Sequence, residues 1–220
     1  MKRKLKLTEV QKRDRVSLIK QWFREKVAFE KVIFTDEVRF SLDGPDNCLS
    51  WELDDENNDC IRQLRQQKGG SIMCYMALTI DGIIVSHLVD GTINSAKYID
   101  IIRDVLLPKL RAKYNDDFIL QQDNASAHKS KATAKFLKDS KVEVLNWPSR
   151  SPDMSLIENI FKSLKDLVYG TEDYTTKKDL WAKIGKCVAF INESKVDMIK
   201  HLYDNITDRF LNVILKQGDN

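Results

Sequence analysis

The chain has few prolines and no long apolar run, and both shortages exclude classes of protein. Only four of its 220 residues are proline, which argues against long disordered segments. No stretch approaches the roughly 18 consecutive apolar residues of a membrane span. The basic N-terminus, residues 1–6, lacks the apolar core of a secretory signal. We therefore expect a soluble protein of the cell interior with no membrane partner.

Metal-binding cysteine motifs and phosphate-binding glycine loops are also missing. The four cysteines form no C-x-x-C pair and the three histidines do not cluster with them, so neither a zinc site nor a disulfide framework is indicated. We expect reduced, mostly buried thiols. Neither GxxxxGK[ST] nor GxGxxG occurs, so nucleotide hydrolysis has no support. The cysteines are Cys48, Cys60, Cys74 and Cys187.

The size of the chain and its charge pattern indicate the number of domains and one possible class of partner. With 220 residues, 42% hydrophobic and 31% charged, the chain fits one main globular domain. The net charge of +3 conceals an asymmetry: residues 1–31 carry eleven Lys/Arg against four Asp/Glu, and residues 43–60 carry seven acids and no base. A basic N-terminal arm can neutralise nucleic-acid phosphates. A solvated helix face explains the same residues equally well.

Hydrophobic periodicity predicts a mixed α/β fold. Alternating and continuous apolar runs indicate strands, with a hairpin at Asp81-Gly82, and apolar residues at helical spacing indicate helices. Pro108 is placed to kink or interrupt one helix, and Ser151-Pro-Asp153 has the composition of a helix start. The expected strands are 31–42, 71–80, 83–89, 118–122 and 142–146; the expected helices are 8–27, 95–114, 131–139, one following 151, and two more between 175 and 217. A mixed sheet flanked by helices accounts for this order.

Three acidic positions stand in distinctive segments. Asp36 and Asp123 each follow a short apolar run of strand type, and Glu158 lies on a helical pattern. Carboxylates brought together from such elements form a cage for hard divalent cations such as Mg²⁺. Two such ions about 4 Å apart can catalyse phosphoryl transfer on nucleic acid. Any single acid of this kind is more often a turn or cap residue, so the hypothesis depends on all three contexts occurring together.

The three contexts resemble the catalytic domain of Tc/mariner superfamily transposases. The matching segments are Val-Ile-Phe-Thr-Asp-Glu around Asp36, Gln-Gln-Asp-Asn-Ala-x-x-His around Asp123, and Trp-Pro-x-x-Ser-Pro-Asp-x-x-x-Ile-Glu-Asn around Glu158. The interval of 34 residues (158 − 123 − 1) and the third acid being Glu are similar to the Tc-like branch. The resemblance covers about residues 5–217.

The resemblance implies an RNase H-like fold and cut-and-paste DNA transposition with two Mg²⁺ or Mn²⁺ ions. Asp36, Asp123 and Glu158 would be the catalytic and metal-binding triad, with Asp36 bridging both ions. The implied partners are double-stranded DNA, as transposon ends and target, and a second copy of the chain on that DNA, in the nucleus. The implied organisation is a basic helical arm over 1–30 and a catalytic domain over 31–217, with a clamp-like insertion over 44–70 and a helical C-terminal region.

Two departures from the family pattern affect the expectations. Leu156 stands where the family usually has proline before Ile-Glu-Asn, which should loosen the start of that helix without removing a ligand. The family also begins with about 100 residues of paired helix-turn-helix modules that bind the element's ends, and this sequence starts just before the catalytic region. We therefore expect specific end binding to be absent.

Residues next to the triad are candidates for supporting roles, each with a structural alternative. Asn124, Asn159 and His128 could hydrogen-bond a carboxylate, water or phosphate, or serve as turn and packing residues. Lys129, Lys131 and Arg150 could hold the DNA backbone, or form solvated surface. Glu37 should point away from Asp36 on a strand and is interpreted as structural.

Three rival functions follow from the same residues. A catalytically silent or domesticated derivative would bind DNA or partners through the basic arm. A structure-directed nuclease would share the fold and differ only in substrate. A two-carboxylate glycosidase would not need three such contexts.

Overall fold

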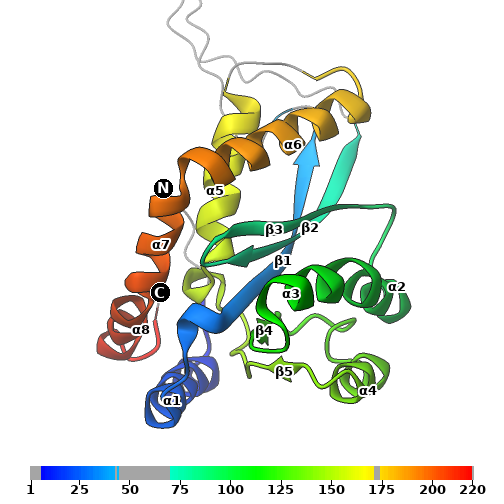
Figure 1. Ribbon diagram of the computed structural model, residues 1–220. Helices are drawn as coiled ribbons and strands as arrows, with labels where there is room; N and C mark the ends of the chain where they lie inside the picture. The colour runs from blue at the N-terminus through cyan, green and yellow to red at the C-terminus, as the bar shows by residue number, and fades with distance from the viewer. Residues whose placement is uncertain (1–5, 43, 45–69, 171–173, 220) are drawn as a thin grey trace, which may run out of the picture.

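A five-stranded mixed sheet runs through the part of the chain that the computed structural model describes, which is residues 6–42, 44, 70–170 and 174–219 (Figure 1). The strand order is β3-β2-β1-β4-β5; β1 pairs antiparallel with β2, and β2 with β3, whereas β4 is parallel to β1 and to β5. The strands are β1 (Val32–Ser41), β2 (Ser71–Thr79), β3 (Gly82–Val89), β4 (Ile119–Gln121) and β5 (Glu143–Val144). The predicted mixed α/β fold is confirmed. Nearly all of the predicted insertion over 44–70, including Trp51, lies outside the described residues.

Helices cover both faces of this sheet. Helices α2 to α4 pack on one face, and α5 to α8 with α1 lie on the other (Figure 1). The helices are α1 (Glu9–Glu25), α2 (Ser95–Ile101), α3 (Leu107–Tyr114), α4 (Lys131–Asp139), α5 (Ile157–Tyr169), α6 (Lys177–Ser194), α7 (Val196–Asp204) and α8 (Ile206–Leu215). Among the helices described, none combines the length and apolar character that crossing a bilayer requires.

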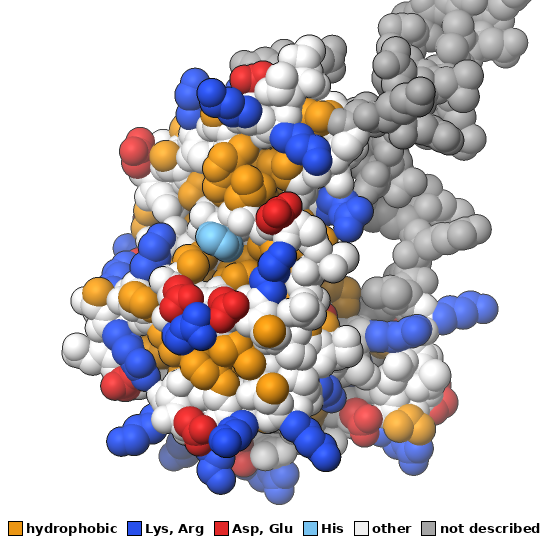
Figure 2. All heavy atoms as spheres, turned by 90° about the vertical axis from the view of Figure 1, so that its right-hand side faces the viewer, with side chains coloured by type: hydrophobic (Ala, Val, Ile, Leu, Met, Phe, Trp, Pro, Cys, Tyr) orange, Lys and Arg blue, Asp and Glu red, His pale blue; other side chains and the backbone are white. Residues whose placement is uncertain are grey.

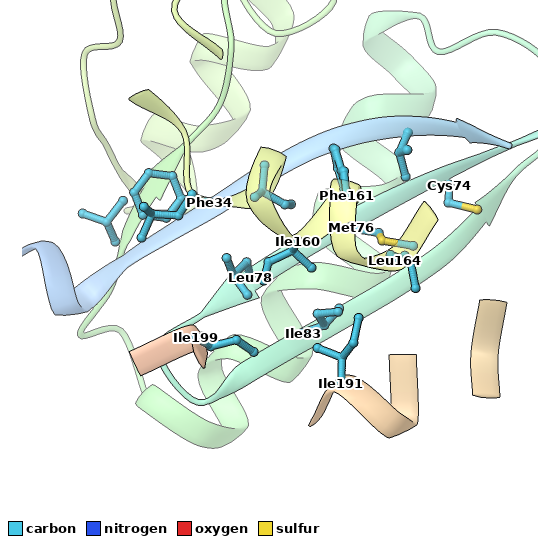
Figure 3. Packing of buried hydrophobic residues seen from close by; sticks show 14 of the residues in the cluster. Phe34, Cys74, Met76, Leu78, Ile83, Ile160, Phe161, Leu164, Ile191 and Ile199 are labelled. Atoms are coloured by element: carbon cyan, nitrogen blue, oxygen red, sulfur yellow. The ribbon is translucent and has the colours of Figure 1, made fainter. Parts of the chain in front are cut away.

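Strand alternation divides the core into two clusters. Ile33 faces the α2–α4 side, and its neighbour Phe34 faces the α5–α8 side, because successive strand side chains point to opposite faces. On the second side, Ile160 and Leu164 of α5 pack with Met76 of β2 (Figure 3). Each fully buried aliphatic side chain contributes about 1.5–3 kcal/mol, so this cluster fixes α5 firmly on the sheet.

Helix α1 is part of the second cluster. Thr8 caps its start in a capping box with Gln11, and Lys26 ends it with a left-handed φ of 53°. Trp22 is 2% exposed and stacks on Trp147 at 5.4 Å between ring centroids. Phe210 of α8 lies 5.2 Å from Trp22. The first and last helices therefore share one aromatic core.

Two helices differ in their boundaries from the sequence prediction. The helix expected over 95–114 is divided by a π-helical turn, Ile102–Leu106, just before Pro108. The helix start predicted at Ser151 is wrong: residues Pro152–Met154 form a short 3₁₀ turn, and α5 begins at Ile157. The Ser151 hydroxyl does not cap a helix, because it donates to the Ser149 carbonyl and accepts from Arg15.

The C-terminal region was predicted as two helices, and three are present. The chain breaks at Lys195 and again at Asn205, with φ of −123° and −94°. Breaks of one residue barely disturb the apolar periodicity, which explains why the sequence did not reveal them. The strand expected over 142–146 pairs only at Glu143–Val144.

Candidate active site

The register of the parallel pair places Asp36 and Asp123 at matching positions. Pairing between β1 and β4 ends at Phe34↔Gln121, so each aspartate lies two residues beyond the last pair. The Thr35 hydroxyl donates to the Gln121 carbonyl at 2.8 Å and joins strands β1 and β4 at this point. Asp36 lies within β1 and still pairs with β2. The sequence interpretation that each aspartate follows the end of a strand therefore holds for Asp123, which comes after β4, but not for Asp36.

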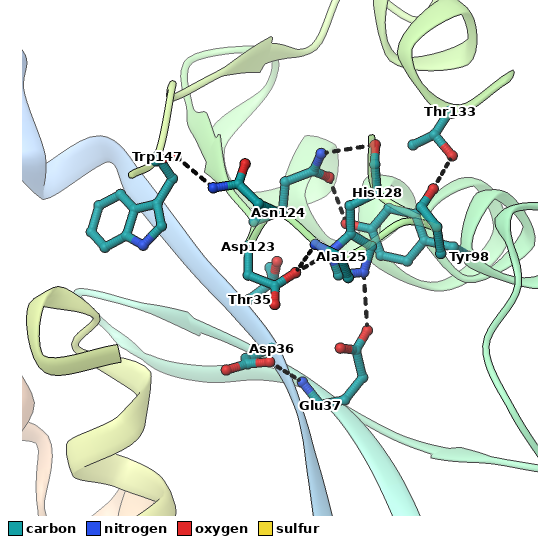
Figure 4. A network of polar contacts seen from close by, with 12 residues as sticks. Thr35, Asp36, Glu37, Tyr98, Asp123, Asn124, Ala125, His128, Thr133 and Trp147 are labelled. Atoms are coloured by element: carbon teal, nitrogen blue, oxygen red, sulfur yellow. Dashed lines mark hydrogen bonds and ion pairs between the residues drawn. The ribbon is translucent and has the colours of Figure 1, made fainter. Parts of the chain in front are cut away.

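One cavity contains all three predicted acids. Asp36, Asp123 and Glu158 line a hollow of about 440 Å³, together with the segment from Trp147 to Pro152. Glu158 reaches it from the first turn of α5. Figure 4 shows Asp36 and Asp123 projecting towards the same space from neighbouring elements. The structure thus brings together side chains that are far apart in the sequence.

Burial and mutual repulsion make this cavity unfavourable for carboxylates alone. Burial raises the pKa of Asp36 to about 7, and the charges of Glu37, Glu158 and Asp123 add to the effect, against the backbone N–H of Glu37, which donates to Asp36. Burial also raises the pKa of Glu158, opposed by Lys165. A bound cation would remove this penalty, because an opposite charge favours the ionised form.

Asp123 is held from the other side by His128. Its Oδ1 lies 2.6 Å from Nδ1 of His128 and accepts the backbone N–H of Ala125 at 2.8 Å (Figure 4). The hydrogen bond from His128 lowers the pKa of Asp123. Burial lowers the pKa of His128, but the bonds to Asp123 and Glu37 outweigh it and raise that pKa to about 9. Asp123 is therefore ionised and His128 protonated near neutral pH.

A buried polar network fixes the His128 imidazole. The ring of Tyr98 lies 4.1 Å from it between centroids, and the Tyr98 hydroxyl donates to Gln122 at 2.7 Å (Figure 4). Gln122 in turn donates to the His128 carbonyl. The sequence analysis missed Tyr98 and Gln122. Gln122 stands inside the Gln-Gln-Asp-Asn segment and could have been found there, whereas Tyr98 gives no local signal.

The other predicted residues lie at varying distances from the cavity. Asn124 and Arg150 line it, and the Asn124 amide donates to the Trp147 carbonyl at 2.8 Å. Asn159 does not line it; its side chain accepts from Arg209 at 2.9 Å. Lys129 and Lys131 are exposed near the start of α4, outside the lining.

The donor set suits a hard divalent cation. Oxygen ligands from carboxylates are what Mg²⁺ and Mn²⁺ take, and Mg²⁺ keeps several waters. Within the described ranges, no three or more His, Cys, Asp or Glu side chains group closely enough to hold one ion. All three carboxylates line one cavity, and water and substrate oxygens would have to complete the coordination of an ion bound there.

Sequence comparisons match most of this chain to known proteins. The family described as DDE superfamily endonuclease matches residues 31–186. The Tc3 transposase of Caenorhabditis elegans is 33% identical over 192 residues, which is 87% of this chain and 57% of that protein. The Tcb2 transposase of Caenorhabditis briggsae is 27% identical over 83% of this chain and 72% of its own length. The chain thus spans little more than half of Tc3 transposase.

Solved structures share the fold. The catalytic domain of Mos1 mariner transposase superposes with a TM-score of 0.78 at 16% identity, covering 100% of this chain and 99% of that one. A pre-cleavage Mos1 transpososome gives 0.84 at 17% identity, covering 67% of its chain. The similarity confirms the predicted RNase H-like fold.

Proposed function

Because the chain belongs to the DDE superfamily endonucleases and, within them, to the Tc/mariner transposases, we propose that it performs the phosphodiester chemistry of cut-and-paste DNA transposition. The observation that supports this most directly is the register-matched pair Asp36 and Asp123, which shares one cavity with Glu158. Phosphoryl transfer needs charge stabilisation more than covalent chemistry from the protein, and three converging carboxylates supply the means to bind cations.

Asp36, Asp123 and Glu158 would hold two divalent ions. Asp36 is the most buried of the three, and the family resemblance implies that it would be the ligand shared by both ions, with Asp123 and Glu158 as the further ligands. When bound, such ions activate a water or a DNA 3′-hydroxyl and stabilise the leaving oxygen. Solved neighbours include the Mos1 catalytic domain with raltegravir and Mg or Mn, which supports the choice of metal.

The residues of this chain would orient the reacting groups. His128 and the Ala125 N–H hold one oxygen of Asp123, which directs the other towards the cavity. Arg150, on its rim, would contact a phosphate of the scissile strand. The pair Trp147-Pro148 forms an apolar wall that would restrict water around the reacting phosphate.

Double-stranded DNA is the proposed substrate, as transposon end and as target. Mos1 neighbours were solved with a left transposon end and as a strand transfer complex. On the face shown in Figure 2, Lys and Arg side chains are spread from the upper to the lower end, with Asp and Glu side chains among them. Exposed Lys129 and Lys131 lie at the start of α4, where they would neutralise backbone phosphates. Action as a homodimer on DNA, in the nucleus, completes the proposal.

A nicking assay tests it. Asp123→Asn removes a negative ligand at nearly constant volume, so it should abolish Mn²⁺-dependent nicking of supercoiled plasmid while leaving the circular dichroism spectrum unchanged. Asp139→Asn, an exposed aspartate at the end of α4, is the matched control and should nick normally. Retained metal-dependent nicking in Asp123→Asn would overturn the assignment. The rival interpretation as a silent DNA-binding derivative is less well supported, because the carboxylate cavity is intact.

A further inference from the structure

Two arginines from opposite ends of the chain converge on the segment that leads to Glu158. Arg15 lies on α1 and Arg209 on α8. Both bond to Asp153 in the 3₁₀ turn that precedes α5. Neither arginine lines the carboxylate cavity. Their partners, however, lie on the cavity wall at Ser151, in the 3₁₀ turn at Asp153 and in the first turn of α5 at Asn159.

Arg15 is fully buried and makes three side-chain contacts. Its Nη1 donates to Ser151 Oγ at 2.9 Å and to Asp153 Oδ1 at 2.8 Å, and its Nη2 donates to Asp153 Oδ2 at 2.5 Å. Its Nε has no hydrogen-bond partner among the described residues. A buried guanidinium is costly unless its geometry is good, and here a bidentate pair with a carboxylate offsets part of that cost. Ser151 itself lines the cavity, so this pair fixes the cavity wall.

Arg209 holds the same segment one step further along. Its Nη1 donates to the Asp153 carbonyl at 3.1 Å, and its Nη2 donates to Asn159 Oδ1 at 2.9 Å. Asn159 directly follows Glu158. Helix α5 has no side-chain cap at Leu156, and an uncapped first turn is prone to fray. Arg209 therefore ties down a helix end that its own sequence leaves unsupported.

Both arginines lie on helices that pack against each other. Helices α1 and α8 are joined by the contact of Trp22 with Phe210, 5.2 Å between centroids, and Trp22 also stacks on Trp147 of the cavity wall. A side chain that must present a ligand within a fraction of an ångström needs such support from packed neighbours.

We propose that Arg15 and Arg209 are positioning residues that hold Glu158 at the metal site through Asp153 and Asn159. The inference rests on the proposed function, since it assigns Glu158 a ligand role. It also gives α1 a task beyond the basic arm that its composition suggested: α1 supports the third carboxylate from within the protein. Neither arginine touches substrate or metal in this scheme.

The test uses Arg209→Met and Asn159→Ala, because removing the fully buried Arg15 can unfold the protein. Arg13→Met, an exposed arginine on α1, is the matched control. Mn²⁺ binding is measured by electron paramagnetic resonance without DNA, and amide hydrogen exchange is followed by mass spectrometry over residues 149–162. Both test variants should weaken Mn²⁺ binding about 10–100-fold and speed exchange in this segment but not in α4.

The double variant Arg209→Met with Asn159→Ala tests whether Arg209 acts through Asn159. If Arg209 acts through Asn159, the combined loss of Mn²⁺ affinity should be close to that of either single variant, since residues of one network are not additive. Arg209→Lys, which keeps the charge and one donor direction, should restore part of the affinity. Wild-type Mn²⁺ affinity and exchange in both single variants would overturn the proposal. A wild-type protein that binds Mn²⁺ but does not nick DNA would instead contradict the proposed function, leaving the positioning role to be decided by the exchange data.

Discussion

The imidazole of His128 lies between two carboxylates, with Nδ1 2.6 Å from Asp123 Oδ1 and Nε2 3.3 Å from Glu37 Oε1. Glu37 pairs in register with Tyr75 on the α2–α4 side of the sheet, whereas Asp36 pairs with Met76 on the other. The acid that directly follows Asp36 thus does not line the cavity and reaches Asp123 only through the histidine.

His128→Gln should lower Mn²⁺-dependent nicking about 10–100-fold, the usual effect of losing a group that orients a metal ligand. Gln cannot place a donor where Nδ1 lies, so Asp123 would lose its support. His128→Asn, whose amide lies closer to the Nδ1 position, should lose less. His87→Gln on β3 makes the same kind of change away from this network and serves as the control. Equal activity in all three variants would contradict the role of His128.

The stability of the metal-free protein should fall in alkaline solution. The pKa of His128 is raised from 6.5 to about 9, so the stability that its protonated form contributes is fully present below about pH 6.5 and is lost as pH rises through about 9. Urea unfolding between pH 7 and 10 measures this loss. The His128→Gln variant should show a shallower decline over the same range. If stability falls equally with pH in the wild type and in His128→Gln, deprotonation of His128 is not the cause of the decline.

Asp36→Asn should stabilise the metal-free protein at pH 8 while removing its response to metal. The pKa of Asp36 is raised from 3.8 to about 7 by burial and by neighbouring acids, so its ionised form weakens the fold as pH rises through this range. Removing the charge should add about 1–3 kcal/mol, less than the full shift because solvent screens part of it.

Thermal unfolding with and without Mg²⁺ measures both effects of Asp36→Asn. Wild type should gain stability from Mg²⁺ at pH 8, and the variant should not. Asp139→Asn should keep the wild-type response. A variant that is less stable than wild type without metal would show that the Asp36 carboxylate is not under electrostatic strain.

Asn192→Ala should destabilise the fold by about 1–3 kcal/mol through a different mechanism, the loss of partners for backbone groups. The Asn192 amide accepts from the Ile83 N–H at 2.8 Å and donates to the Ile83 carbonyl at 3.0 Å. It therefore completes the outer edge of β3, which is an edge strand of the sheet. Glu193→Ala, at the exposed neighbouring position, should change the urea midpoint little. Equal midpoints for the two variants would contradict this account.

The sequence singled out the three acids that line the cavity because its signals are local. Apolar runs mark the strands that carry Asp36 and precede Asp123, and the helical stripe of Leu164 and its neighbours marks the face of α5 beside Glu158. Motifs of a few residues around each acid contain that information. The Asp81-Gly82 turn likewise predicted the β2–β3 hairpin.

The residues that hold the site in place could not be predicted from local sequence signals. Arg15 is one of many charged residues on an amphipathic helix, and nothing near it in the sequence indicates that it is buried. Its partner Asp153 lies 138 residues away, and only the tertiary packing of α1, which includes the stacking of Trp22 on Trp147, brings the two together. The same contact explains the wrong helix start, because Ser151 bonds to Arg15 instead of capping α5.

The parallel pairing of β1 with β4 also determines when in folding the site can form. The hairpin of β2 and β3 closes over a short turn, but the bond from Thr35 to Gln121 joins residues 86 positions apart. Contacts between such distant residues form late, since the chain between them must lose its freedom first. During synthesis the hairpin can form while the site is incomplete, and Glu158 must still emerge from the ribosome. Metal-binding capacity should therefore be the last property that a newly made or refolding molecule acquires.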